Sequence, residues 1–171
     1  MTTRAAASNL MRVQTNWTSN FFRSRETNYM TAGGNGAMMR IQPHVWAARD
    51  PSVWESFSLD VIRNAICTHG HPRGIAGAVL HAVTLAEALN SSEAPPPTAW
   101  ERAVEWLSEV PRLMRADEAV SVLWVSRWES ESELPMEEAF LKVQSECRSD
   151  LLVKVAPLRR RLTTRGLGIW K

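Results

Sequence analysis

The sequence predicts an all-α fold, and three observations support this prediction. Apolar residues recur at three- and four-residue steps in several segments, and no segment shows sustained alternation of apolar and polar residues. Short polar or proline-rich stretches separate these segments. With 171 residues, of which 44% are hydrophobic and 22% charged, the chain is long enough for one domain with a core. We therefore expect packed helices joined by short connections.

Three helical segments are expected in the first half of the chain. The first covers about residues 8–22 and ends in the polar stretch RSRETN. The second covers residues 37–48, where Pro43 would kink the helix or confine it to one side. The third covers residues 55–68, and its apolar stripe continues to His69 at the C-terminal end.

Four helical segments are expected in the second half. The first covers residues 72–89, begins with a proline that suits a first turn, and carries small residues that let neighbours approach closely. After the loop NSSEAPPPT, Thr98 and Glu101 form a capping box that opens the next helix. The last two helices cover about residues 116–128 and 136–151.

The charge of +2 is unevenly distributed along the chain. The segment 154–171 has six basic residues and no acidic one, so the rest of the chain is acidic. We therefore divide the chain into a domain over residues 1–153 and a basic tail over residues 154–171, and the fold need not include the tail. A basic tail can bind nucleic acid, but no recognisable nucleic-acid fold accompanies it, and we expect a solvated segment.

Membrane, secretory and disulfide-rich classes are not expected. No run of 18 or more apolar residues is present, and the N-terminal residues lack the apolar core of a signal peptide. The two cysteines, Cys67 and Cys147, form no CxxC motif. We expect a cytoplasmic protein.

The stretch GGNGA contains Gly33, Gly34, Asn35 and Gly36 and has two interpretations. Glycines let backbone amides approach a ligand closely, and a helix that follows such a loop favours an anion such as a diphosphate. Asn-Gly is also a strong signal for a tight turn. The loop by itself does not distinguish these interpretations.

The stretch CTHGHP has three interpretations. Cys67, His69 and His71 have the ligand chemistry that suits zinc, although no second ligand cluster accompanies them. A histidine at a helix end can instead be structural, with one ring nitrogen held by a carbonyl group. In the third interpretation, His69 faces the same cavity as the glycine loop and contacts the ligand.

Tryptophan is abundant in this chain. Tryptophans can stack on a base or sugar, but most of these lie at helical positions beside aliphatic residues, which favours packing in the core or at helix edges. The eight are Trp17, Trp46, Trp54, Trp100, Trp106, Trp124, Trp128 and Trp170.

The two motifs together resemble the central part of the ADP-ribosylglycohydrolase family, which includes dinitrogenase reductase-activating glycohydrolase and the ADP-ribosyl-acceptor hydrolases. The resemblance lies in GNGAMMRIQPHVW followed by THGHPRGIAGAVLHA and covers about residues 17–89. The positions that match the family pattern are Gly34, Asn35, Gly36, Met39, Arg40, Pro43, Thr68 and His69.

This resemblance implies a partial helical bundle of the ADP-ribosylglycohydrolase type, incomplete at both ends, with a cleft for ADP-ribose. Gly33, Gly34, Asn35 and Gly36 would line the diphosphate and distal ribose, and His69 would contact the nucleotide. The family reaction is hydrolysis of the glycosidic bond of an ADP-ribosylated acceptor, with a pair of magnesium ions. The implied partners are ADP-ribose or an ADP-ribosylated protein.

The aspartates depart from the family pattern. The family holds its metals with a Ser/Thr-Asp-Asp motif and an Asp-x-Asp-Ser/Thr motif, but Asp50, Asp60, Asp117 and Asp150 form neither. Magnesium prefers several oxygen ligands, usually including carboxylates. We therefore assign no catalytic residue and no metal ligand, and expect the chain alone to be inactive.

Three explanations of this departure remain open. The chain is a fragment of a family hydrolase, a non-catalytic ADP-ribose-binding module, or a structural or partner protein whose missing half comes from a complementing chain. A fragment would expose apolar faces of the helix over residues 72–89, including Ile75, Val79 and Val83, so we also expect marginal solubility or self-association.

Overall fold

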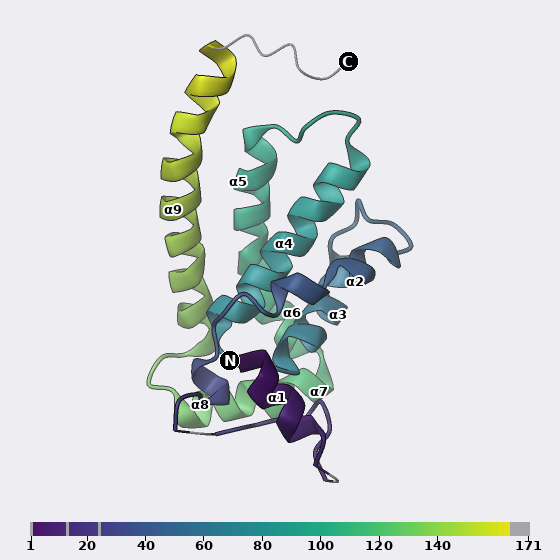
Figure 1. Ribbon diagram of the computed structural model, residues 1–171, viewed down its shortest axis with the longest axis vertical. Helices are drawn as coiled ribbons and strands as arrows, with labels where there is room; N and C mark the ends of the chain where they lie inside the picture. The colour runs from purple at the N-terminus through teal and green to yellow at the C-terminus, as the bar shows by residue number, and fades with distance from the viewer. Residues whose placement is uncertain (1, 13, 24, 165–171) are drawn as a thin grey trace.

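The computed structural model describes residues 2–12, 14–23 and 25–164, with the backbone alone at residue 97 and over residues 151–164. Helices dominate these residues (Figure 1). The extended pairing in the described part is one isolated antiparallel bridge between Arg23 and Asn28. The predicted all-α class is confirmed.

The first half of the chain forms short helical pieces and then two longer helices. In order they are α1 (Thr2–Leu10), the 3-10 turns η1 (Tyr29–Thr31) and η2 (Met38–Arg40), α2 (Gln42–Trp46), α3 (Glu55–Ile66) and α4 (Pro72–Asn90).

The second half continues as helices with short connections. In order they are α5 (Pro97–Trp106), η3 (Leu107–Glu109), α6 (Val110–Ala116), α7 (Glu118–Val120), the π-helical segment η4 (Ser121–Val125), α8 (Ser126–Glu131) and α9 (Met136–Thr164). No helix in the described ranges is long and apolar enough to cross a membrane.

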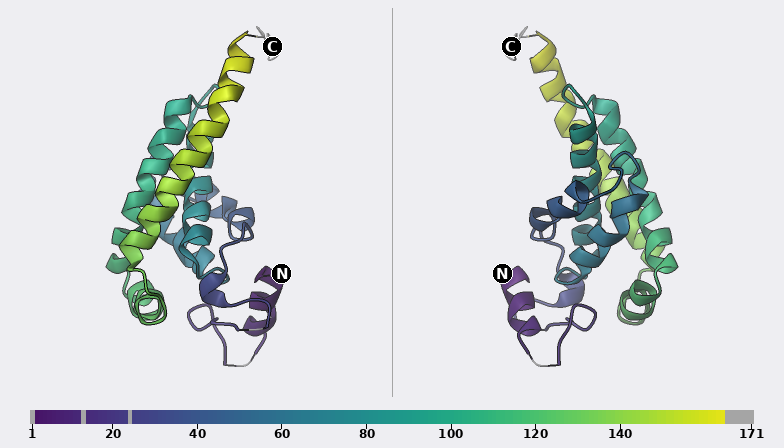
Figure 2. Two further views of the ribbon diagram at one scale, coloured as in Figure 1. Left: turned by 90° about the vertical axis from the view of Figure 1, so that its left-hand side faces the viewer. Right: turned by 90° about the vertical axis from the view of Figure 1, so that its right-hand side faces the viewer.

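Helix α4 is the centre of the fold. It packs against α2, α3, α5 and α9, and Figure 1 shows it between α3 and the pair α5 and α9. Figure 2 shows α1 set to one side of α5 and α9. Ile75, Val79 and Val83 of α4 are all 0% exposed, so the expectation that this face is exposed is wrong. The neighbouring helices cover it within this chain.

Small residues in the first turns of α4 let the glycine loop pass close to the helix. A Cβ atom at Gly74 would lie 3.2 Å from the carbonyl oxygen of Ala32, and one at Gly77 would lie 3.1 Å from Met38 Sδ. Larger side chains here would push the loop away from α4.

The predicted helix over residues 8–22 is wrong, because α1 lies earlier and ends at Leu10. Local polar contacts replace the helix. The side-chain oxygen of Asn16 accepts from the backbone N–H groups of Thr18 (2.9 Å) and Ser19 (3.1 Å). Such Asx turns compete with helical hydrogen bonds. The Asn20 amide then donates to the carbonyl of Cys67 (2.6 Å), which ties this loop to the end of α3.

Two further helix starts differ from the prediction. The expected helix over residues 37–48 is the turn η2 followed by α2, and Pro43 lies in the first turn of α2 rather than at a kink. The predicted capping box at Thr98 is wrong, because α5 already begins at Pro97 and has no side-chain cap. Thr98 therefore lies inside the first turn, where it cannot act as the N-cap.

The expected helix over residues 116–128 is interrupted by the π-helical segment η4. Asp117 caps α7 by accepting from the backbone N–H of Val120 (2.8 Å). Within and after the wider turn, Trp124 and Trp128 stack with ring centroids 5.5 Å apart and an interplanar angle of 9°. Both are buried, which confirms core packing for this pair, whereas Trp46 is 65% exposed.

The predicted boundary between domain and tail falls within α9, which continues to Thr164. The division at residue 153 stays a prediction. The side chains of the basic segment and Trp170 lie outside the described residues.

Candidate functional site

The glycine loop is held against the turn between α3 and α4. The backbone N–H of Gly70 donates to the carbonyl of Tyr29 (3.1 Å), and that of His71 donates to the carbonyl of Ala32 (3.4 Å). The Trp124 indole donates to the carbonyl of Gly70 (3.1 Å). The stretches GGNGA and CTHGHP therefore lie side by side.

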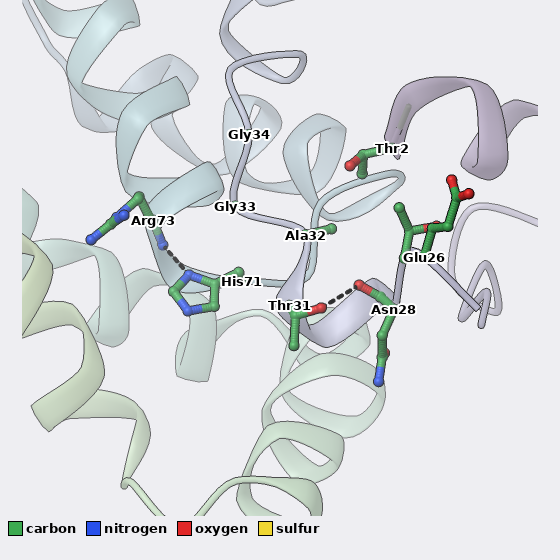
Figure 3. Close-up of a pocket in the computed structure, with 10 residues that line it drawn as sticks. Thr2, Glu26, Asn28, Thr31, Ala32, Gly33, Gly34, His71 and Arg73 are labelled. Atoms are coloured by element: carbon green, nitrogen blue, oxygen red, sulfur yellow. Dashed lines mark hydrogen bonds between the residues drawn. The ribbon is translucent and has the colours of Figure 1, made fainter. Parts of the chain in front are cut away.

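A first cavity of about 380 Å³ lies on one side of the loop. Gly33 and Gly34 form one wall, and His71 and Arg73 come from the start of α4 (Figure 3). The opposite wall is polar and consists of Thr2, Glu26, Thr27, Asn28 and Thr31.

A second cavity of about 410 Å³ lies between the loop, α4 and α9. Gly33, Gly34 and Asn35 line it from the loop. Arg73 borders both cavities and forms an ion pair with Glu146 of α9. The loop and the start of α4 thus separate two adjacent spaces.

His69 lies beneath the loop, at the end of α3. It is only 1% exposed. A Cβ atom at Gly36 would lie 3.2 Å from Nε2 of His69, and one at Gly34 would lie 4.0 Å from the same nitrogen. Nδ1 lies 2.7 Å from the hydroxyl of Thr68. Burial, the charge of Arg40 and the chain's amino terminus lower the pKa of His69 to about 4, so the ring is neutral at pH 7.

Arg40 connects the loop to α3. Its guanidinium donates to the Asn64 side chain (2.7 Å), to the Asn64 carbonyl (2.7 Å) and to the Thr68 hydroxyl (2.5 Å). It also donates to the carbonyl of Gly36 (3.3 Å). No carboxylate among the described residues pairs with it, so its positive charge acts on the loop.

His71 is a cavity-lining residue that the sequence did not identify as such. Its Nδ1 accepts from the backbone N–H of Arg73 (3.1 Å) and caps α4, while its ring lies edge-on to Trp128, with centroids 6.0 Å apart. Burial, followed by the charge of Arg73, lowers its pKa. A histidine immediately before Pro72 at a helix start was the available signal, because that is the N-cap position.

The five predicted ligand-binding residues occupy two different environments. Gly33, Gly34 and Asn35 line the cavities, whereas Gly36 of the loop and His69 beneath it line neither. Their role in binding stays a prediction.

The zinc interpretation of CTHGHP has no support in this geometry. The thiol of Cys67 points to the carbonyl of Arg63 (3.2 Å), and the Nδ1 atoms of His69 and His71 are occupied by Thr68 and the cap of α4. Within the described ranges, no group of three or more His, Cys, Asp or Glu side chains could hold a metal ion.

The aspartates do not fit a magnesium site either. Asp50 accepts from the backbone N–H of Ser52 (2.9 Å), and both Asp60 and Asp117 pair with Arg63. Asp150 lines the second cavity, which none of the other three aspartates lines. The donor set that a magnesium ion prefers is therefore not assembled by the described side chains.

A helical domain in which a glycine loop covers a buried histidine and borders two cavities defines a candidate ligand-binding site. A family model described as ADP-ribosylglycohydrolase matches residues 1–158. The chain therefore belongs to the ADP-ribosylglycohydrolase family, which confirms the resemblance and extends it beyond residues 17–89. No curated protein and no solved structure matches this chain. Family membership indicates an ADP-ribosylglycohydrolase-like function, with ADP-ribosylated molecules as the substrate class.

Proposed function

We propose that the glycine loop binds the diphosphate of ADP-ribose. The observation that carries this proposal is the position of His69, which is only 1% exposed and lies directly beneath the loop, with Nε2 3.2 Å from where a Cβ atom of Gly36 would be. A buried polar ring against a glycine-rich loop is where a ligand bound by that loop would find a hydrogen-bond partner.

The backbone of the loop supports the same ligand. No hydrogen bond within the described part of the chain uses the backbone N–H groups of Gly33, Gly34, Asn35 and Gly36 as donors. Free amides in a glycine-rich loop form a concave site for anions. Arg40, which donates to the Gly36 carbonyl, adds a positive charge that no described carboxylate compensates. The N-terminal end of α4 borders the first cavity, and the partial positive charge of a helix N-terminus favours an anion there.

Calorimetry with ADP-ribose tests this site on the full chain. We expect binding that weakens about tenfold in Asn35→Ala, because Asn35 lines the second cavity and a lost charge-assisted hydrogen bond costs about 1.4 kcal/mol or more. The matched control is Asn90→Ala, at the exposed C-terminal end of α4, which should bind as the wild type does. AMP, which lacks the diphosphate, should bind more weakly than ADP-ribose.

Two results would contradict the proposal. One is wild-type protein that does not bind ADP-ribose. The other is binding that is unchanged in both Asn35→Ala and His69→Gln, because neither the loop side chain nor the ring beneath the loop would then contact the nucleotide.

We propose in addition that this chain binds without hydrolysing. The family reaction relies on magnesium held by aspartate motifs, and Asp50, Asp60 and Asp117 are engaged by Ser52 and Arg63 instead. Catalysis would then need carboxylates from outside this sequence, supplied in a longer polypeptide or by a complementing chain. A chain that acts without such a partner would be a non-catalytic ADP-ribose-binding module.

A further inference from the structure

The Thr68 hydroxyl joins a charged donor to the buried imidazole. Its oxygen lies 2.5 Å from Nη2 of Arg40 and 2.7 Å from Nδ1 of His69. An arginine can only donate hydrogen bonds, so the hydroxyl oxygen must accept from Arg40. The single hydroxyl proton then remains for a second contact.

That proton has one acceptor within the described contacts, which is Nδ1 of His69. A neutral imidazole has one protonated and one unprotonated nitrogen. When Nδ1 accepts from Thr68, the ring proton must be on Nε2. The reverse arrangement, with Nδ1–H donating to Thr68, would leave the buried hydroxyl proton without an acceptor among the described residues and is disfavoured.

We propose that Arg40 and Thr68 are positioning residues that hold neutral His69 in its Nε2–H tautomer, so that the ring donates a hydrogen bond toward the ligand of the glycine loop. The order is Arg40 to Thr68, Thr68 to His69, and His69 to the ligand. Its consequence for ligand binding rests on the proposed function, whereas the tautomer itself does not.

The location of Nε2 lets this tautomer donate a hydrogen bond to a ligand of the glycine loop. Nε2 lies under Gly34 and Gly36, 4.0 Å and 3.2 Å from where their Cβ atoms would be. An N–H group there adds a donor to those of the backbone, and an anionic oxygen can accept from all of them. Because Arg40 is charged, the site is positive without protonation of His69.

The tautomer can be measured directly in the free protein by ¹⁵N NMR of the histidine side chains. The His69 signals are assigned from their loss in His69→Gln. We expect wild-type His69 to show a protonated Nε2 and an unprotonated Nδ1. Thr68→Ser keeps the hydroxyl and should give the same spectrum, whereas Thr68→Val and Arg40→Gln should move the two nitrogen shifts toward each other as the Nδ1–H form becomes populated.

We call the hydrogen-bonded series Arg40, Thr68 and His69 the relay. Matched substitutions separate its effect from that of removing any threonine hydroxyl or any arginine charge. Thr84→Val removes a half-buried threonine hydroxyl of α4 that bonds to the Leu80 carbonyl (2.9 Å), and Arg49→Gln removes an exposed arginine. Neither should alter the His69 spectrum. A wild-type ring protonated on Nδ1, or a Thr68→Val spectrum identical to the wild type, would overturn the proposal.

ADP-ribose calorimetry on the same variants distinguishes the two proposals. Thr68→Val should weaken binding roughly two- to fivefold, because only the fraction of molecules with the competent tautomer binds, and Thr68→Ser should restore it. If the wild-type tautomer is as stated but no ADP-ribose binds, the proposed function fails and the relay stands. If ADP-ribose binds but the tautomer is Nδ1–H, the relay fails and the proposed function stands.

Discussion

Gly36 lies directly over the imidazole of His69. A Cβ atom at Gly36 would be 3.1 Å from Cε1 and 3.2 Å from Nε2 of the ring, and would overlap the hydroxyl of Thr3 in α1. The loop, the end of α3 and the start of α1 therefore meet where there is no room for a side chain. Glycine permits this close approach, which places the buried ring at the underside of the loop.

Two glycines near the site should respond differently to substitution by alanine, one by losing stability and the other by losing ligand affinity. A Cβ atom at Gly70 would overlap the Tyr29 ring and lie 2.7 Å from its carbonyl oxygen, whereas one at Gly34 would have its nearest neighbour at 4.0 Å. We expect Gly70→Ala to lower the free energy of unfolding by about 2 kcal/mol or more, and Gly34→Ala to leave it nearly unchanged while weakening ADP-ribose binding. Urea denaturation and calorimetry measure the two effects. Equal stability of the two variants would contradict the packing described for Gly70.

The stability of the fold should decrease as the pH falls from 6.5 to 4. The pKa of His69 is lowered to about 4 in the folded protein, mainly by burial, while an unfolded histidine titrates near 6.5. In this range the unfolded chain binds a proton that the folded chain does not, so the free energy of unfolding falls by at most about 3 kcal/mol. His71, whose pKa is also lowered, contributes in the same direction.

Denaturation at several pH values measures this slope. His69→Gln should reduce it without abolishing it, because His71 remains. A His69 resonance that titrates near pH 6.5 in the folded wild-type protein would show that the ring is not held neutral by its surroundings.

Two carboxylates on the same arginine should differ in their contribution to stability. Asp117 is 9% exposed, pairs with Arg63 (2.5 Å) and caps α7, whereas Asp60 is 57% exposed and contacts Arg63 at 3.3 Å. We expect Asp117→Ala to cost about 1 to 2 kcal/mol and Asp60→Ala less than about 0.5 kcal/mol. Asp117→Asn should lie between them, because asparagine keeps the cap and loses the charge. Thermal or urea unfolding gives the ranking, and a larger effect at Asp60 would contradict it.

The purified chain should release no ADP-ribose from a modified protein when magnesium is added. The reason is the scattered aspartates, which the described contacts commit to Ser52, Arg63 and the cap of α7. The assay needs a competent family hydrolase as its positive control. Robust magnesium-dependent release by this chain alone would refute the proposal that it binds without hydrolysing.

Periodicity predicted the long elements well. Apolar spacing indicated α3 and α4, and Pro72 indicated where α4 begins. The prediction failed where local side chains decide the backbone. Asn16 forms a turn in place of the first expected helix, and Pro97 starts α5 one residue before the expected cap. Such contacts depend on which competing hydrogen bond the packed chain can keep, and periodicity does not contain that information.

For the site, the sequence by itself determined the residue types and the family pattern. GGNGA and CTHGHP were recognisable because glycines, an asparagine and histidines at these spacings are few and chemically distinctive. Only the tertiary structure decided their arrangement. It placed His69 beneath the loop, brought His71 to the cavity wall, and joined Arg40 to His69 through Thr68. The physical reason is that burial and hydrogen-bond direction depend on contacts between distant segments, which are set when α4 packs against its neighbours.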